Sequence, residues 1–177
     1  MKSKKYQQLV DLIVFAMLGV IMFISKYLTD LLPNIHFLGM LTMTYTITYR
    51  KKALIPIYVF VMLTGLFNGF ALWWIPYLYI WTILWGITML LPKRISKKVA
   101  IPVYAVVCAL HGLCYGILYA PAQAIMFGLN FKGMLMWIGA GLYFDVVHAV
   151  GNFALGFLIV PLSEALKKFH KSAKKEN

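Results

Sequence analysis

The chain has 177 residues, of which 62% are hydrophobic and 12% charged, and its formal net charge is +12. Soluble domains have about a quarter of their residues charged, so this composition excludes an ordinary soluble domain. In a soluble protein a charge of +12 would indicate nucleic-acid binding. Here the cationic residues lie between long apolar segments, so we expect membrane lipids with anionic headgroups as partners and no nucleic acid.

Six apolar segments predict six transmembrane helices in a single integral membrane domain, since about 20 apolar residues cross a bilayer. In chain order they cover 9–28, 35–49, 53–67, 72–91, 100–119 and 139–161, and a basic cytoplasmic tail follows at 163–177. The first segment is longer than the apolar part of a signal peptide and no small-residue cleavage site follows it, so we expect a retained helix. The long connection between the last two segments has room for a short helix of its own.

The basic residues predict the orientation of this all-α bundle. Fifteen of the 17 Lys and Arg residues fall into four clusters at every second gap between apolar segments, at 2–5, 50–52, 93–98 and 167–175. Loops rich in Lys and Arg stay on the cytoplasmic side of a membrane. Both termini are therefore expected in the cytoplasm. The gaps that hold Asp30, Asn68 and Lys132 are expected outside, and Lys26 is the other isolated cation.

The last apolar segment carries the clearest candidate site. Asp145, His148 and Asn152 are spaced i, i+3 and i+7, which places them on one face of a helix. Ionisable side chains inside a transmembrane helix are costly, so they are candidates for function. The alternative is that Asp145 and His148 make a hydrogen bond that only holds helices together.

Two other expected helices carry polar or aromatic stripes at the same depth. The fifth has a histidine near the membrane midplane with two tyrosines further out, and the fourth has an aromatic stripe. The nine candidate substrate-binding residues on the three helices are Trp74, Tyr77, Trp81, His111, Tyr115, Tyr119, Asp145, His148 and Asn152. Two alternatives stay open: the aromatic stripe could belong to an interfacial belt, and the tyrosines to the core.

A pocket of this kind would bind a small ligand that contains a ring, because aromatic faces supply contact area and a few polar groups orient it. No Arg lies in the outer half of any expected helix, so a neutral or cationic ligand is favoured over a polyanion. The Asp145–His148 spacing lacks the further ligands that a metal site needs, so we expect no metal and no cofactor. Cys108 and Cys114 lie on different faces of one expected helix and predict no disulfide.

The chain has no recognisable catalytic motif and no nucleotide-binding loop. We therefore expect no enzyme, and any uphill transport would draw its energy from an ion gradient or from partner subunits. Two other functions stay open. One is an intramembrane enzyme that uses Asp145 with His148 or His111 as an acid–base pair. The other is a stand-alone small carrier or channel.

Two motifs point to a known family. The fifth helix has Leu110, His111, Gly112, Tyr115 and Gly116, and the sixth has Trp137, Gly141, Phe144, Asp145, His148, Gly151, Asn152 and Phe153. With the chain length and the number of helices, these residues resemble the substrate-binding S components of energy-coupling factor (ECF) transporters. The similarity covers nearly the whole chain in layout, and the last two helices in local sequence.

The resemblance implies an S-component-like bundle in a bacterial cell membrane that captures a vitamin or precursor from outside. Because no outer Arg is present, thiamine-like or pyridoxine-like rings are favoured. The resemblance also implies docking onto a membrane coupling subunit that carries two ATPase subunits. In the family, a pair of small residues on the first helix packs on that subunit. The corresponding positions here are Ala16, Gly19 and Val20, with Val20 where the family has its second alanine.

Overall fold

The computed structural model describes residues 4–29 and 35–175, and this part of the chain is helical with no strands. The expected outer loop that holds Asp30 lies outside the described residues, as does Lys2 of the first basic cluster. The α-helices are α1 (Lys4–Leu28), α2 (Leu38–Tyr49), α3 (Leu54–Asn68), α4 (Tyr77–Leu90), α5 (Lys97–Leu113), α6 (Tyr115–Phe127), α7 (Phe131–Gly156) and α8 (Ile159–Lys175). Two short 3-10 helices, η1 (Arg50–Ala53) and η2 (Leu72–Trp74), precede α3 and α4.

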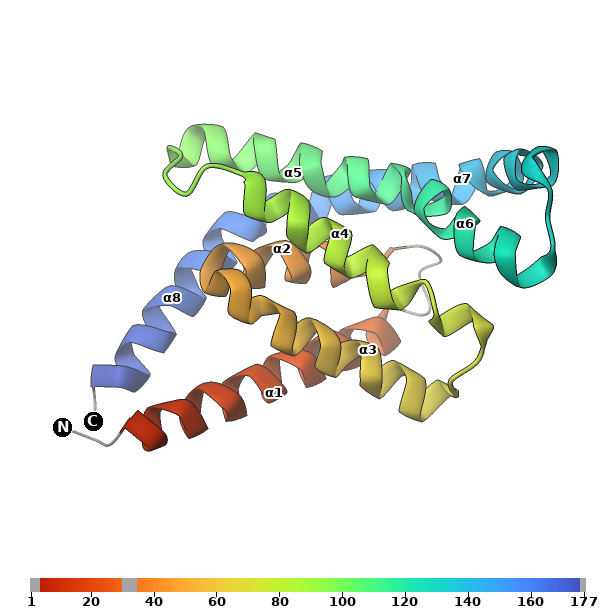
Figure 1. The fold of residues 1–177 in the computed structure, drawn as a ribbon. Helices are drawn as coiled ribbons and strands as arrows, with labels where there is room; N and C mark the ends of the chain where they lie inside the picture. The colour runs from red at the N-terminus through yellow and green to blue at the C-terminus, as the bar shows by residue number, and fades with distance from the viewer. Residues whose placement is uncertain (1–3, 30–34, 176–177) are drawn as a thin grey trace.

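The helices form an all-α membrane bundle, as the composition predicts. Five helical segments of the described chain are long and apolar enough to cross a membrane: Lys5–Leu28, Leu38–Asn68, Leu72–Leu90, Lys97–Phe127 and Phe131–Gly156. The second of these contains a sharp reversal at η1, so α3 runs in roughly the opposite direction to α2 (Figure 1). Arg50 makes this reversal with φ of 55°, a left-handed conformation that is uncommon outside glycine.

The chain runs back and forth between two ends of the bundle (Figure 1). The start of α1, the end of α8, the α2–α3 turn and the α4–α5 connection lie at one end, and the α6–α7 connection lies at the other. The described residues of the four basic clusters therefore gather at one end, which we call the basic end. This is the arrangement that alternating basic loops predict.

The structure differs from the expected boundaries at the last three helices. The segment 100–119 is divided at Cys114, where the chain turns from α5 into α6, and α6 then runs on to Phe127. The segment expected to begin at residue 139 begins at Phe131, because Asn130 caps the helix by accepting a hydrogen bond from the Gly133 N–H at 2.8 Å. The helix ends at Gly156, and the expected tail is the amphipathic helix α8.

Small residues allow α5 and α7 to pack closely against each other. A Cβ atom on Gly156 would lie 2.5 Å from the Ala105 Cα, and one on Gly112 would lie 3.0 Å from the His148 backbone. The two backbones are therefore too close for larger residues at these positions. This close contact holds the middle of α7 at a fixed distance from the end of α5.

Ion pairs attach α8 and the α2–α3 turn to the rest of the basic end. The Asp11 carboxylate of α1 lies 2.8 Å from the Lys52 ammonium and 3.6 Å from the His170 ring on α8. Lys97 of α5 lies 2.7 Å from Glu164 of α8. Both described carboxylates at this end are therefore engaged by cations from other segments.

Candidate substrate-binding site

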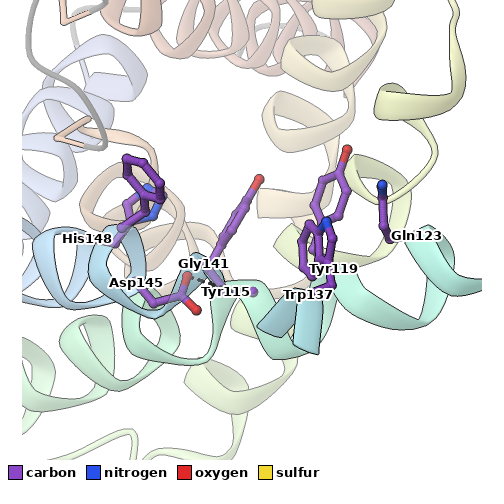
Figure 2. A pocket seen from close by; sticks show the side chains of 9 residues that line it. Tyr115, Tyr119, Gln123, Trp137, Gly141, Asp145 and His148 are labelled. Atoms are coloured by element: carbon purple, nitrogen blue, oxygen red, sulfur yellow. Dashed lines mark hydrogen bonds between the residues drawn. The ribbon is translucent and has the colours of Figure 1, made fainter. Parts of the chain in front are cut away.

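A cavity of about 370 Å³ lies between α6 and α7, within the usual size range of small-ligand pockets. Figure 2 shows His148 at one end of it and Gln123 at the other. Four of the nine expected site residues line it, together with five further residues. The lining consists of Tyr115, Gly116, Tyr119, Gln123, Trp137, Gly141, Phe144, Asp145 and His148.

The carboxylate of the cavity belongs to Asp145, which is 4% exposed. Its Oδ1 accepts a hydrogen bond from the Gly116 backbone N–H at 3.0 Å. Gly116 is in the first turn of α6, where backbone N–H groups have no partner within the helix and the helix dipole favours a negative charge. The turn at Cys114 creates this helix start beside α7. The break between α5 and α6 therefore positions the Asp145 carboxylate.

His148 joins the cavity to His36, which lies just before α2. Its Nε2 lies 2.6 Å from the Nε2 of His36, and its ring lies 5.0 Å from the Tyr115 ring. One imidazole must donate the hydrogen bond and the other must accept it, so at least one of the two rings is neutral. The described residues contain no group of three or more His, Cys, Asp or Glu side chains arranged to hold a metal ion.

Two stacked rings form the aromatic wall of the cavity. The rings of Tyr119 and Trp137 lie 5.8 Å apart at an interplanar angle of 19° (Figure 2). The Tyr119 hydroxyl donates a hydrogen bond to the Trp73 backbone carbonyl at 3.0 Å, which holds the tyrosine in place. A flat aromatic face supported in this way suits a ligand ring.

Trp81 lies behind the cavity and does not line it. It is 1% exposed, and its ring lies 6.2 Å from Tyr115, 5.9 Å from His111 and 5.9 Å from Tyr77. Three of the expected site residues are therefore packed behind the Tyr115 ring: Tyr77, Trp81 and His111. The Trp81 indole N–H is buried without a hydrogen-bond partner in the described residues.

The remaining hydrogen bonds of the expected site residues join helices to one another. Trp74 donates from its indole to the Val61 carbonyl of α3 at 2.8 Å. Asn152 donates to the Cys108 carbonyl of α5 at 3.2 Å. Both side chains therefore have structural partners and lie away from the cavity lining.

The sequence pattern singled out none of Trp137, Gln123 and His36 as binding residues. Trp137 precedes Asp145 by eight residues and shares its helical face. Helical spacing therefore relates Trp137 to the site once α7 is known to begin at Phe131. Gln123 lies in the connection between the expected helices 100–119 and 139–161, which had room for a short helix. The contact of His36 with a residue 112 positions away carries no local sequence signal.

The three expected docking residues on α1 lie on different faces. Gly19 is buried against α3, and a Cβ atom there would lie 2.6 Å from the Val59 Cβ. Ala16 and Val20 are exposed on the surface of α1. Only Ala16 and Val20 are therefore accessible to a partner, and Gly19 serves the packing of α1 on α3.

No protein-family model, curated protein or solved structure matches this chain. It is a multi-pass α-helical membrane protein with an aromatic cavity that contains one carboxylate.

Proposed function

We propose that this protein is the membrane-embedded substrate-binding subunit of an ECF-type, ATP-driven uptake system in a bacterial cell membrane. The cavity between α6 and α7 is the observation that carries the proposal. It has the volume, the stacked aromatic wall and the single carboxylate that suit a small ring-containing micronutrient. The protein binds its cargo, and a membrane coupling subunit with two ATPase subunits supplies the energy.

The charge of the lining supports a neutral or cationic ligand. Among the described residues that line the cavity Asp145 is an acid, and none is Lys or Arg. A cation would be attracted both to this carboxylate and to the faces of Tyr119 and Trp137. Thiamine-like or pyridoxine-like rings, as vitamins or precursors, therefore suit the cavity better than polyanions such as folates.

The position of the cavity supports uptake from outside. It is built from α6 and α7, and their connection lies at the end of the bundle opposite the basic end (Figure 1). If the basic end faces the cytoplasm, as the positive-inside rule requires, both termini are cytoplasmic and the cavity lies in the outer half. A ligand could then enter from the external medium.

The hydrogen bonds at the site favour binding over catalysis. Asp145 is bonded to the Gly116 amide, His148 to His36, and His111 lies 3.3 Å from the Ile80 carbonyl. Asp145 and His148 both line the cavity, but an acid–base pair arranged for catalysis should also share a hydrogen bond. Here each group has its own structural partner, which supports a role in shaping the cavity.

Thermal-shift measurements on the purified protein test the ligand class. Thiamine or pyridoxine should raise the melting temperature, and folate should not. Stabilisation by folate alone would contradict the proposal. Incubation with the stabilising compound should yield no product, since turnover without partners would indicate an enzyme.

Reconstitution tests the transport assignment. Liposomes that contain this chain alone should bind the compound without accumulating it, and addition of a coupling subunit with its two ATPases should give ATP-dependent uptake. Flux through the chain alone, driven by a proton or sodium gradient, would instead identify a stand-alone carrier.

A further inference from the structure

We propose that a second cavity, at the basic end, binds a phosphate group, as carried by the headgroup of an anionic lipid. This cavity has a volume of about 150 Å³ and lies where η1, the α4–α5 connection and α8 meet. Arg50, Lys93 and Lys167 line it, with Thr88 and Tyr104 at its wall. It is separate from the aromatic cavity between α6 and α7, and the two share no lining residue.

The three cations come from segments far apart in sequence and converge without a balancing acid. None of the described residues that line the cavity is Asp or Glu. The two described carboxylates of the basic end are engaged elsewhere, Asp11 with Lys52 and Glu164 with Lys97. Three positive charges around one cavity repel each other unless an anion lies between them.

Arg50 is held in place and has hydrogen-bonding capacity left over. Its terminal NH2 group donates to the Met89 carbonyl at 2.8 Å, and its own carbonyl accepts from the Trp85 indole at 3.1 Å. Its Nε is buried with no hydrogen-bond partner in the described residues. A buried donor without a partner is costly, and a guanidinium suits the oxygens of a phosphate. The left-handed backbone of Arg50 belongs to the same turn.

The location favours a lipid phosphate over free phosphate. Arg50 lies in the turn within the apolar segment Leu38–Asn68, and Lys93 follows the apolar segment Leu72–Leu90. If the basic end faces the cytoplasm, both residues lie where the lipid headgroups begin. Clusters of cations at this level on the cytoplasmic side attract anionic lipids, with about 1 kcal/mol for each Lys or Arg. Lys167 on the amphipathic helix α8 would close over the headgroup and hold α8 against the bundle.

Native mass spectrometry of the delipidated full-length protein tests the site. Phosphatidylglycerol should remain bound at one copy more strongly than diacylglycerol, which has the same acyl chains and no phosphate group. The variant Lys93→Gln/Lys167→Gln should bind phosphatidylglycerol about 25-fold more weakly, at about fivefold per lysine. The matched control is Lys98→Gln/Lys168→Gln, which removes the same charge from exposed lysines at the same end that do not line the cavity. The control should bind almost as well as the unmodified protein.

A second arm distinguishes the two sources of the phosphate group. Stabilisation by millimolar inorganic phosphate, lost in Lys93→Gln/Lys167→Gln, would support the phosphate site but assign it to a free anion. Equal losses in both double variants would show diffuse surface attraction and overturn the proposal. Equal retention of the two lipids would overturn it as well. Arg50→Gln should weaken binding further. If this variant fails to fold, the lysine variants still test the proposal, because they alter exposed side chains.

Discussion

The Asp145 carboxylate accepts a 3.0 Å hydrogen bond from the Gly116 backbone N–H, which joins the middle of α7 to the first turn of α6. A Cβ atom on Gly116 would overlap this carboxylate. The residue at position 116 must therefore be glycine for the carboxylate to lie where it does. This contact sets the distance between the two helices that form the aromatic cavity.

Gly116→Ala should displace Asp145 and weaken ligand binding, although alanine is the better helix former by about 1 kcal/mol. Equilibrium titration of the purified variant should show at least about a tenfold loss of affinity, which corresponds to about 1.4 kcal/mol. Gly139→Ala on α7 is the matched control, because a Cβ atom there meets nothing within 4 Å. Equal affinities of the two variants would contradict the role given to the Gly116 contact.

Asp145→Asn should weaken binding of a cationic ligand by about 1.5–3 kcal/mol, since hydrogen bonds to charged groups contribute about this much. The asparagine carbonyl can still accept from the Gly116 N–H, so folding and membrane insertion should be unchanged. Titration with thiamine, which is cationic, and with a neutral ring analogue separates the effect of the lost charge from that of a changed cavity shape. A loss of the same size for both compounds would show that the charge of Asp145 does not act on the ligand.

Trp137→Ala should lower ligand affinity by about 1–3 kcal/mol, the usual contribution of a ring stacked on an aromatic side chain. Trp81→Ala should instead lower the free energy of unfolding by about 3–5 kcal/mol, because Trp81 is buried behind the Tyr115 ring. Ligand titration and thermal unfolding of both variants measure the two effects. Unchanged affinity in a well-folded Trp137→Ala protein would remove the aromatic wall from the site.

Ala16→Leu should leave ligand binding intact and block uptake by the complete transporter, if the exposed face of α1 is the docking face. Gly19→Leu is the contrasting variant: it should destabilise the isolated protein, since Gly19 is packed against Val59 of α3. Measurements of ligand binding to the purified chain and of ATP-dependent uptake into liposomes distinguish a docking defect from a folding defect. Normal uptake by Ala16→Leu would place the docking surface elsewhere.

The helical periodicity of the sequence predicts which polar residues share a face, but not what each of them contacts. Asp145 and His148 share a face and both line the cavity. Asn152 shares that face too, yet it is hydrogen-bonded to the Cys108 carbonyl of α5, because α5 and α7 approach closely at this level. Which side chain meets a cavity depends on the spacing between helices, and periodicity within one helix does not report it.

Local sequence also gives little sign of the two backbone features that build the sites. The turn at Cys114 interrupts a long apolar run and creates the α6 start that binds Asp145. The left-handed residue of the α2–α3 turn is Arg50, where glycine would be the usual choice. Both features depend on contacts with other helices, which no local pattern shows.

Native mass spectrometry of the protein, purified from its own membrane in mild detergent, tests the ligand cavity most directly. A ligand cavity between α6 and α7 predicts one small ring-containing compound bound per chain, retained in Gly139→Ala and reduced in Gly116→Ala. Lipid as the only bound species, or a compound retained equally in both variants, would contradict a ligand cavity between α6 and α7.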